Sequence, residues 1–241
     1  MASPNAFEFD QAILATYLTL NKSHTKSALI GLELNESGEF SPIIRLLGKD
    51  FVGIKININD WLKLKSYFPK IDSYFDDNKD DEEKNWVKLE CDRFNIFQVY
   101  MYNSFIIKFE EAHDASNEKK FYHQILMKKT SFDALKRLVP CIDLRLDELK
   151  KKIPLVKSSI DTLVNFLKNK MIDRHCAQTT QVNAYEVMSI IDELSVDDFE
   201  IMYKNVKSPE FGETDAKYLL HELKILHARY IIDCLKFNIE Q

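Results

Sequence analysis

The sequence predicts an α+β fold in which a set of antiparallel strands followed by a helix occurs twice in tandem, before an all-helical C-terminal subdomain. The main observation is an internal repeat. Residues 53–72, GIKININDWLKLKSYFPKID, return without a gap 71 positions later as residues 124–143, QILMKKTSFDALKRLVPCID. Each copy has a short apolar strand, a polar residue, an amphipathic helix, and a proline before Ile-Asp. Repetition of a whole supersecondary unit constrains architecture more than a single motif does.

The middle of each copy has the residue spacing of a helix. Trp61 opens an apolar stripe with the i, i+3, i+7 spacing of one buried helical face, and Phe132 opens the matching stripe in the second copy. We therefore assign Trp61 and Phe132 to the core. Asp60 and Ser131 stand just before these aromatic residues. They are predicted N-caps, because their side-chain oxygens accept hydrogen bonds from unpaired backbone amides.

A proline occurs at the same position near the end of both helical patterns. These residues are Pro69 and Pro140. Proline lacks an amide hydrogen and crowds the preceding turn of a helix. We therefore expect each helix to end or kink near the residue before its proline, and a second short turn to follow.

Upstream of each helix, short runs rich in β-branched and aromatic residues predict antiparallel strands. The runs are residues 12–20, 27–34 and 40–56 in the first repeat, and residues 86–91, 95–102, 105–112 and 119–128 in the second. The segment NESG, residues 35–38, is a predicted hairpin turn in which Gly38 takes a positive φ. The pattern is three or four antiparallel strands and then a helix, written twice.

Four segments of the chain differ in composition. They are a first strand-helix unit, residues 1–75; an acidic linker, residues 76–84; a second strand-helix unit, residues 85–152; and a helical subdomain, residues 153–241. The linker DDNKDDEEK has no apolar periodicity, which is typical of a solvated connection. The last segment has apolar residues at helical spacing, and its final helix is apolar nearly all round, so it must be buried. We expect residues 153–241 to mediate self-association or to bind a protein partner.

Composition sets further bounds. The chain has 241 residues, 45% of them hydrophobic, so it can bury a substantial core in one or two domains. Its four cysteines include no CxxC pair, which indicates reduced thiols in an intracellular compartment. No apolar run approaches the ~20 residues that span a bilayer. We expect no membrane segment and no secretion or transit signal.

The sequence lacks the common motifs of catalysis and of cofactor binding. Its five glycines form no phosphate-binding loop, and neither HExxH nor GxSxG occurs. His175 and Cys176 are adjacent, so they point in different directions on a helix. His221, His227 and Cys234 are too far apart for a compact zinc site. We therefore expect a protein that is not an enzyme and holds no cofactor or metal.

Residues 53–72 resemble the end of the domain found in positive cofactor four, a transcriptional coactivator family. The matching residues are Gly53, Ile54, Asn57, Trp61, Leu64, Lys65, Ile71 and Asp72. The resemblance implies a curved antiparallel sheet with a packed helix, used to bind single-stranded DNA in the nucleus. Over residues 10–150 it implies two degenerate copies that form a pseudo-dimer within one chain. The Whirly and Pur groups are similar in general plan.

Members of this family bind DNA through basic and aromatic residues on the strands and in the first hairpin loop. Single-strand binding in general needs cations for phosphates and aromatic faces for bases. The candidates are Lys22, Lys26, Arg45, Lys49 and Lys55 in the first repeat, and Tyr100, Tyr102, Lys108, Lys119, Lys120, Tyr122, Lys128 and Lys129 in the second. Strand alternation puts Lys120, Tyr122 and Gln124 on one face.

The chain departs from the family at its expected contacts. The family loop Phe-Lys-Gly-Lys between the first two strands is matched by Tyr102-Asn103-Ser104 in the second repeat and by Lys22 and Lys26 in the first. Glu33 and Glu110 stand where the family has an arginine. Two functions therefore remain open. One is binding of single-stranded nucleic acid, DNA before RNA, in transcription or replication. The other, favoured by the net charge of −5, is a protein-interaction module that kept the fold and lost the ligand.

Overall fold

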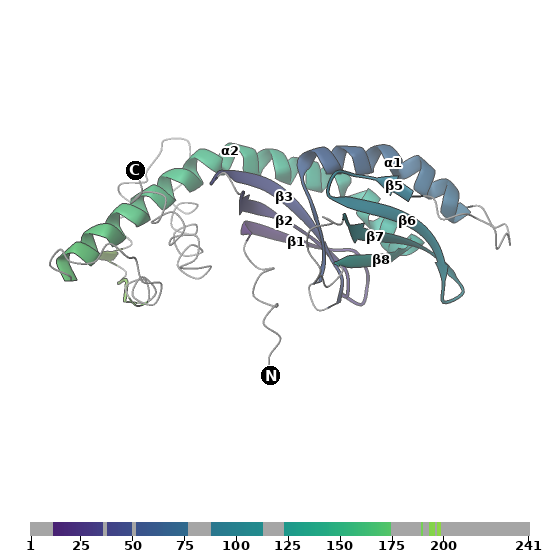
Figure 1. Cartoon of the computed structure of the whole chain (residues 1–241), viewed down its shortest axis with the longest axis horizontal. Coiled ribbons are helices and arrows are strands. Elements are labelled where there is room, and N and C mark those ends of the chain that lie inside the picture. Colours follow the sequence, from purple (N-terminus) through teal and green to yellow (C-terminus); the bar gives the residue numbers. More distant parts are fainter. Residues whose placement is uncertain are drawn as a thin grey trace. The chain divides into compact units, whose positions relative to one another are not determined.

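The computed structural model describes residues 12–35, 38–49, 52–76, 88–112 and 123–174, with residues 189, 193–195 and 197–198. In each repeat a four-stranded antiparallel sheet is followed by a helix, which confirms the predicted α+β class (Figure 1). Contacts divide the chain into two compact parts, Met1–Gly31 with Pro42–Asp147, and Leu32–Ser41 with Glu148–Gln241. The helices of both repeats begin in the first part.

The first repeat forms a sheet of strand order β1-β2-β3-β4. The elements are β1 (Ile13–Thr19), β2 (Ser27–Leu34), β3 (Phe40–Leu47), β4 (Gly53–Ile56) and α1 (Ile58–Asp76). The run predicted over residues 40–56 is therefore two strands. The turn between β2 and β3 is as predicted, since Gly38 has a φ of 77° and its amide donates to the Asn35 carbonyl at 3.0 Å. The Asn35 side chain accepts the Glu39 amide at 2.8 Å.

The second repeat forms a sheet of strand order β5-β6-β7-β8. The elements are β5 (Lys88–Glu90), β6 (Phe94–Met101), β7 (Ser104–Glu111), β8 (Gln124–Lys128) and α2 (Lys129–Arg174). A two-residue turn joins β6 to β7, and both of its residues, Tyr102 and Asn103, have positive φ, at 52° and 51°. This conformation is the tight turn that matches the twist of a hairpin.

Both helices bury the residues that the repeat duplicates. Trp61 in α1 and Phe132 in α2 are almost completely buried, as predicted, and so are Leu64 and Leu135 one turn later. Full burial of a large apolar side chain stabilises a fold by roughly 1.5–3 kcal/mol. These paired positions are therefore a large part of the stability of the two repeats.

The predicted N-caps are wrong, because β4 runs into α1 without a loop and the helix begins earlier than expected. Asn57 precedes α1, and its side-chain oxygen accepts the Asp60 amide at 2.7 Å. Asp60 instead lies in the first turn, buried, and accepts the amide of Asp92 from the second repeat at 2.7 Å. Ser131 lies in the first turn of α2, where it is also buried.

The prolines do not end the helices. Pro69 lies inside α1, and α2 continues through Pro140 to Arg174. A proline inside a helix costs about 3 kcal/mol. Beyond Pro69 the helix buries Ile71, Tyr74 and Phe75. Since each such side chain contributes roughly 1.5–3 kcal/mol, burial outweighs the cost and the helix persists.

The predicted helical subdomain, residues 153–241, lies mostly outside the described residues, as do linker residues 77–84. In the part that is described, α2 passes without a break through the boundary expected at residue 152. The apolar spacing expected there is confirmed as far as residue 167, with Val156, Ile160 and Leu163 buried. No helix among the described residues combines the length and hydropathy needed to cross a membrane.

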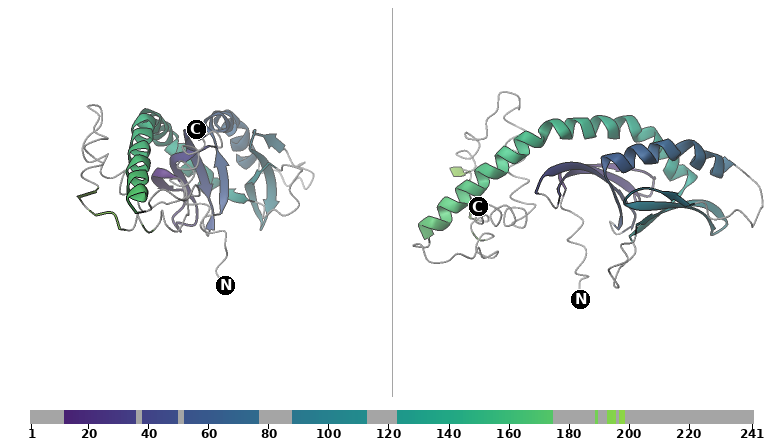
Figure 2. Two further views of the ribbon diagram at one scale, coloured as in Figure 1. Left: turned by 60° about the vertical axis from the view of Figure 1, so that its left-hand side comes forward. Right: turned by 45° about the horizontal axis from the view of Figure 1, so that its top comes forward.

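The two helices meet through reciprocal ion pairs. Lys65 Nζ lies 2.8 Å from Asp143 Oδ2, and Lys136 Nζ lies 2.5 Å from Asp72 Oδ1. Lys136 and Asp143 occupy the repeat positions of Lys65 and Asp72. Each copy thus supplies the lysine of one pair and the aspartate of the other, which is the pattern of contacts across a two-fold axis. Figure 2 shows α1 and the first part of α2 side by side.

Aromatic rings fill the space between these ion pairs. The Phe68 ring lies 6.3 Å from Trp61 and 5.2 Å from Phe132, edge-on to both. The ammonium groups of Lys65 and Lys136 lie over the Trp61 and Phe132 rings, at 5.7 and 5.5 Å. Trp61 Nε1 also donates to Asp143 Oδ1 at 2.7 Å. Edge-to-face ring pairs add roughly 0.5–1.5 kcal/mol beyond the area that they bury.

Gly53→Ala is expected to destabilise the fold strongly. A Cβ at residue 53 would lie 1.8 Å from the Leu46 carbonyl oxygen, which belongs to the backbone of the neighbouring strand and cannot turn aside. We expect the free energy of unfolding, measured by urea denaturation, to fall by about 3 kcal/mol. The matched control is Gly38→Ala, where a Cβ meets nothing within 4 Å. Only the positive φ of residue 38 should then lower the free energy of unfolding, by about 1 kcal/mol. Equal losses for the two variants would contradict this account.

The reciprocal ion pairs are expected to be energetically coupled. In a double-mutant cycle of Lys65→Met with Asp143→Asn, the coupling should be about 1 kcal/mol, because the pair is only partly exposed and has good geometry. Asparagine keeps an oxygen for the Trp61 hydrogen bond. The exposed pair Lys63–Asp92, at 3.5 Å, is the control and should show no measurable coupling. Denaturant midpoints of the variants give both values, and similar coupling in the two cycles would refute the assignment.

Candidate nucleic-acid interface

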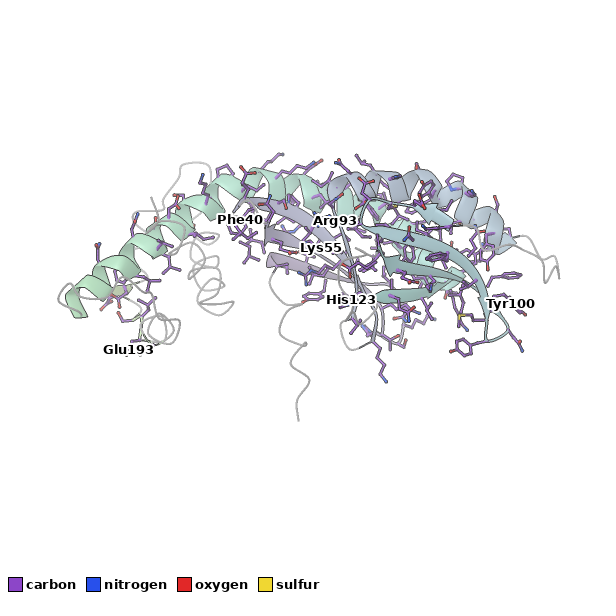
Figure 3. All side chains as sticks on the ribbon, in the orientation of Figure 1. Phe40, Lys55, Arg93, Tyr100, His123 and Glu193 are labelled. Atoms are coloured by element: carbon purple, nitrogen blue, oxygen red, sulfur yellow. The ribbon has the colours of Figure 1, made fainter. Side chains whose placement is uncertain are left out.

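The β6–β7 hairpin presents aromatic side chains at its tip. Tyr102 is 80% exposed, Tyr100 is 63% exposed, and Met101 between them is 38% exposed. Figure 3 labels Tyr100 at this end of the sheet, opposite His123, which precedes β8. Clustered exposure of large apolar groups is typical of a contact surface. We call Tyr100, Met101, Tyr102 and Asn103 the hairpin tip.

The register of the second sheet divides the predicted residues between its two faces. Tyr100 pairs with Phe105, and the two rings lie 5.1 Å apart. Phe105 contacts Tyr74 of α1 at 5.3 Å, so this is the helix-covered face. Lys108 pairs with Phe97, and Lys128 pairs with Ile106, two residues from Lys108 on β7. Because alternate residues share a face, Lys108 and Lys128 lie on the opposite side, which we call the outer face.

The lysines in the middle of the outer face are already neutralised. Lys108 forms an ion pair with Glu110, and its ammonium lies 4.9 Å from the Phe97 ring. Lys88, on the neighbouring strand, lies 2.6 Å from Glu90. Lys88 and Phe97, which are not among the residues predicted from the sequence, also belong to this face, and strand alternation over residues 95–102 is sufficient to place Phe97 there. The predicted phosphate contact of Lys108 must therefore compete with an internal carboxylate.

Lys128 differs from these lysines. It is exposed at the end of β8, and it has no carboxylate partner among the described residues. The pairing of Lys128 with Ile106 puts it at the end of the sheet that carries the hairpin tip, because Ile106 is two residues from the start of β7. The structure therefore places Lys128 at the same end of the sheet as the predicted residues Tyr100 and Tyr102, but on the opposite face from Tyr100.

Of two further predicted residues, one forms an ion pair with an aspartate and the other is buried. Lys129 lies 2.7 Å from Asp76 at the end of α1, and this hydrogen bond raises the pKa of Lys129. Arg45 is only 6% exposed, in a stretch of β3 that is buried on both faces, and it pairs with half-buried Lys55 on β4. The burial of Arg45 does not favour the phosphate contact expected of it, which stays a prediction. Strand alternation in the sequence shows which residues share a face of a sheet. It does not show whether tertiary packing buries both faces, as it does at β3.

The remaining cations of the first repeat lie around its strand ends. Lys22 is exposed in the β1–β2 turn, Lys26 is half-buried just before β2, and Lys49 is exposed after β3. Lys119, Lys120 and Tyr122, which we predicted from the sequence, lie outside the described residues.

The two segments matched to the family's first hairpin loop are not equivalent. Lys22 and Lys26 lie between the first and second strands of their sheet, whereas Tyr102 and Asn103 lie between the second and third strands of theirs. At most one of the two comparisons with the family loop is therefore correct.

Cys91, the residue after β5, has a buried thiol and lies near Asp60 in the first turn of α1. Burial and the nearby Asp60 carboxylate raise the pKa of Cys91 to about 12. A thiol with this pKa is protonated at neutral pH and is a poor nucleophile. No group of three or more metal-ligating side chains occurs within the described part of the chain.

Comparison with known protein families finds no match to this chain, and comparison with curated proteins finds no relative. The resemblance to positive cofactor four therefore stays a prediction. The structure gives several of the residues that carry it a physical role. Gly53 allows close strand approach, Asn57 caps α1, and Lys65 and Asp72 join the helices.

The two described cysteines are expected to differ in reactivity. Cys141 is exposed on α2 and Cys91 is buried with a raised pKa. At pH 8 the native protein should take up iodoacetamide at Cys141, and Cys91 should react only after unfolding. Peptide mapping by mass spectrometry distinguishes the two sites. Fast native labelling of Cys91 would show that the α1–β5 junction opens readily and would contradict the packing described above.

Proposed function

We propose that this protein binds single-stranded nucleic acid and acts without catalysis in transcription or replication. DNA is the first candidate ligand and RNA is the second. The observation that carries the proposal is the hairpin end of the second sheet, which presents the exposed side chains of Tyr100, Tyr102 and Lys128, with Tyr100 and Lys128 on opposite faces. Aromatic faces stack on bases of any sequence, for roughly 1–3 kcal/mol per base, and lysines attract phosphates. Exposed tyrosines at the same end of the sheet as a lysine without a carboxylate partner among the described residues fit this chemistry.

The scaffold supports the same proposal. The reciprocal pairs Lys65–Asp143 and Lys136–Asp72 relate the two repeats as the subunits of a homodimer are related. We propose that the two repeats form a pseudo-dimer. This is the arrangement that the resemblance to positive cofactor four and Whirly proteins implies, and members of the first family bind single-stranded DNA.

Within the pseudo-dimer, the second repeat is the better candidate for the ligand. Residues 28–32 of β2 and 42–47 of β3 are all buried, so the centre of the first sheet has no open face. The second sheet keeps exposed residues at its hairpin tip and along its outer face. We propose that the first sheet supports the fold and that the second contacts the bases.

A protein-interaction module is the second candidate, because two observations favour it. Glu110 and Glu90 neutralise the outer-face lysines, Lys108 and Lys88. The hairpin tip includes the apolar side chain of Met101, which suits a protein surface as well as a base. Such a module would contact its partner through the same tip but would show no preference for single strands.

Titration of the full chain with labelled single- and double-stranded oligonucleotides tests the proposal. We expect tighter binding of the single strand, with an affinity that falls as salt rises, because phosphate contacts release counterions. Tyr100→Ala and Tyr102→Ala should each weaken binding by about 5- to 100-fold, the loss of one stacked base. Fluorescence anisotropy gives these affinities.

Tyr17→Ala is the matched control, since Tyr17 is also an exposed strand tyrosine but belongs to β1 of the first repeat. It should leave binding unchanged. Absence of a single-strand preference, or absence of salt dependence, would refute nucleic-acid binding. Purification with a stoichiometric protein partner whose binding needs Tyr102 would then favour the interaction module.

A further inference from the structure

We infer that Tyr74 of the first repeat positions Tyr100 of the second repeat for contact with the nucleic acid, and that it acts through the Phe105 ring. The inference rests on the proposed function and deepens it, because it adds a positioning residue from α1 that does not itself touch the ligand. The observation that carries it is a series of three aromatic rings in contact, which leads from the buried side chain of Tyr74 to the exposed side chain of Tyr100.

Tyr74 is the fixed end of this series. It lies in the last turn of α1, where it is only 8% exposed, and its ring lies 5.7 Å from that of Phe75. The Phe75 ring in turn lies 5.9 Å from that of Phe132 in α2. Burial raises the pKa of Tyr74 to about 12, and a hydrogen bond with the Ile106 backbone has a smaller effect in the opposite direction. Contacts with both helices and with β7 therefore hold the Tyr74 ring in one orientation.

Phe105 joins Tyr74 to Tyr100. It is the half-buried second residue of β7, and it lies directly opposite Tyr100 on β6. Its ring lies 5.3 Å from the Tyr74 ring at an interplanar angle of 84°, and 5.1 Å from the Tyr100 ring at 59°. Both distances are typical of interacting ring pairs, whose centroids lie about 4.5–7 Å apart. Removal of the Tyr74 ring would leave a space into which Phe105 can turn away from Tyr100.

Tyr100 gains from this support because its side chain is largely exposed. An exposed side chain loses rotational freedom when a ligand binds, and this loss weakens binding. The contact with Phe105 restricts the Tyr100 ring before a base stacks on it. Tyr102 differs, since it is 80% exposed and has no ring contact within the described part of the chain. Tyr74 should therefore affect the contribution of Tyr100 to binding and not that of Tyr102.

The test compares single-stranded oligonucleotide binding by the full chain with binding by Tyr74→Leu and Tyr74→Phe. Leucine removes the ring and keeps an apolar side chain, so affinity should fall by about 2- to 10-fold, the effect of one more side chain to be ordered on binding. Phenylalanine keeps the ring, so affinity should stay close to that of the wild type. Phe105→Leu interrupts the series at the next ring. It should weaken binding like Tyr74→Leu, and it replaces that variant in every measurement if Tyr74→Leu does not fold.

Double variants show whether Tyr74 acts through Tyr100. Tyr74→Leu should cause no further loss of affinity when Tyr100→Ala is already present, because the ring that it positions is gone. In the Tyr102→Ala protein it should cause its full loss. Equal losses in the two backgrounds would overturn the inference and leave the proposed function intact.

Phe109→Leu is the matched control for a purely structural effect. Phe109 is completely buried on the same face of the sheet as Phe105, and its ring lies 6.1 Å from that of Phe94. The substitution should lower the melting temperature at least as much as Tyr74→Leu does. It should leave affinity unchanged at a temperature where both variants are folded. Similar losses of affinity in the two variants would show that stability controls binding, and would overturn the positioning role.

Aromatic NMR signals of the free protein separate failure of the inference from failure of the proposed function. The Tyr100 ring signals, identified by their absence in Tyr100→Ala, are shifted by the neighbouring Phe105 ring. They should move toward the values of an exposed tyrosine in Tyr74→Leu and stay in place in Tyr74→Phe. If the wild type binds no oligonucleotide, the proposed function fails, and a shift in Tyr74→Leu would still support the positioning of Tyr100. Unmoved Tyr100 signals in Tyr74→Leu would overturn it.

Discussion

The contact between α1 and the first part of α2 is the constraint on which the arrangement of the two repeats depends. Apolar burial is strong but non-directional, so the rings of Trp61, Phe68 and Phe132 stabilise the contact without fixing its register. The ion pairs Lys65–Asp143 and Lys136–Asp72 supply direction, because each forms at only one relative position of the helices. Together they hold the second sheet against a helix from the first repeat.

That helix also supports the candidate site. Asp60 accepts the Asp92 amide beside β5, and Tyr74 contacts Phe105, which in turn contacts Tyr100. Ring contacts thus continue from the helix interface to the hairpin tip. A binding residue that packs on a rigid element keeps its orientation better than one on an isolated loop. Tyr102, at the turn itself, has the exposure of a stacking platform without this support.

Local patterns predicted the strands and helices well, because alternation and helical spacing report which face of an element is buried. They failed where contacts between residues distant in the sequence determine where a helix begins or which face of a strand is buried. The N-caps were misplaced because β4 enters α1 directly through Asn57, and Arg45 proved buried because β3 is covered on both faces. Lys65 and Asp72 were recognised as repeated residues, but their role was not, since each pairs with a residue more than 60 positions away.

Amide hydrogen exchange of the full chain, with and without a single-stranded oligonucleotide, tests the central proposal that the hairpin end of the second sheet holds the strand. We predict slower exchange at the hairpin tip, and unchanged exchange in the buried centres of β2 and β3. Double-stranded DNA at the same concentration should give much weaker protection. Unchanged exchange at the hairpin tip, under conditions where the oligonucleotide binds, would contradict the account.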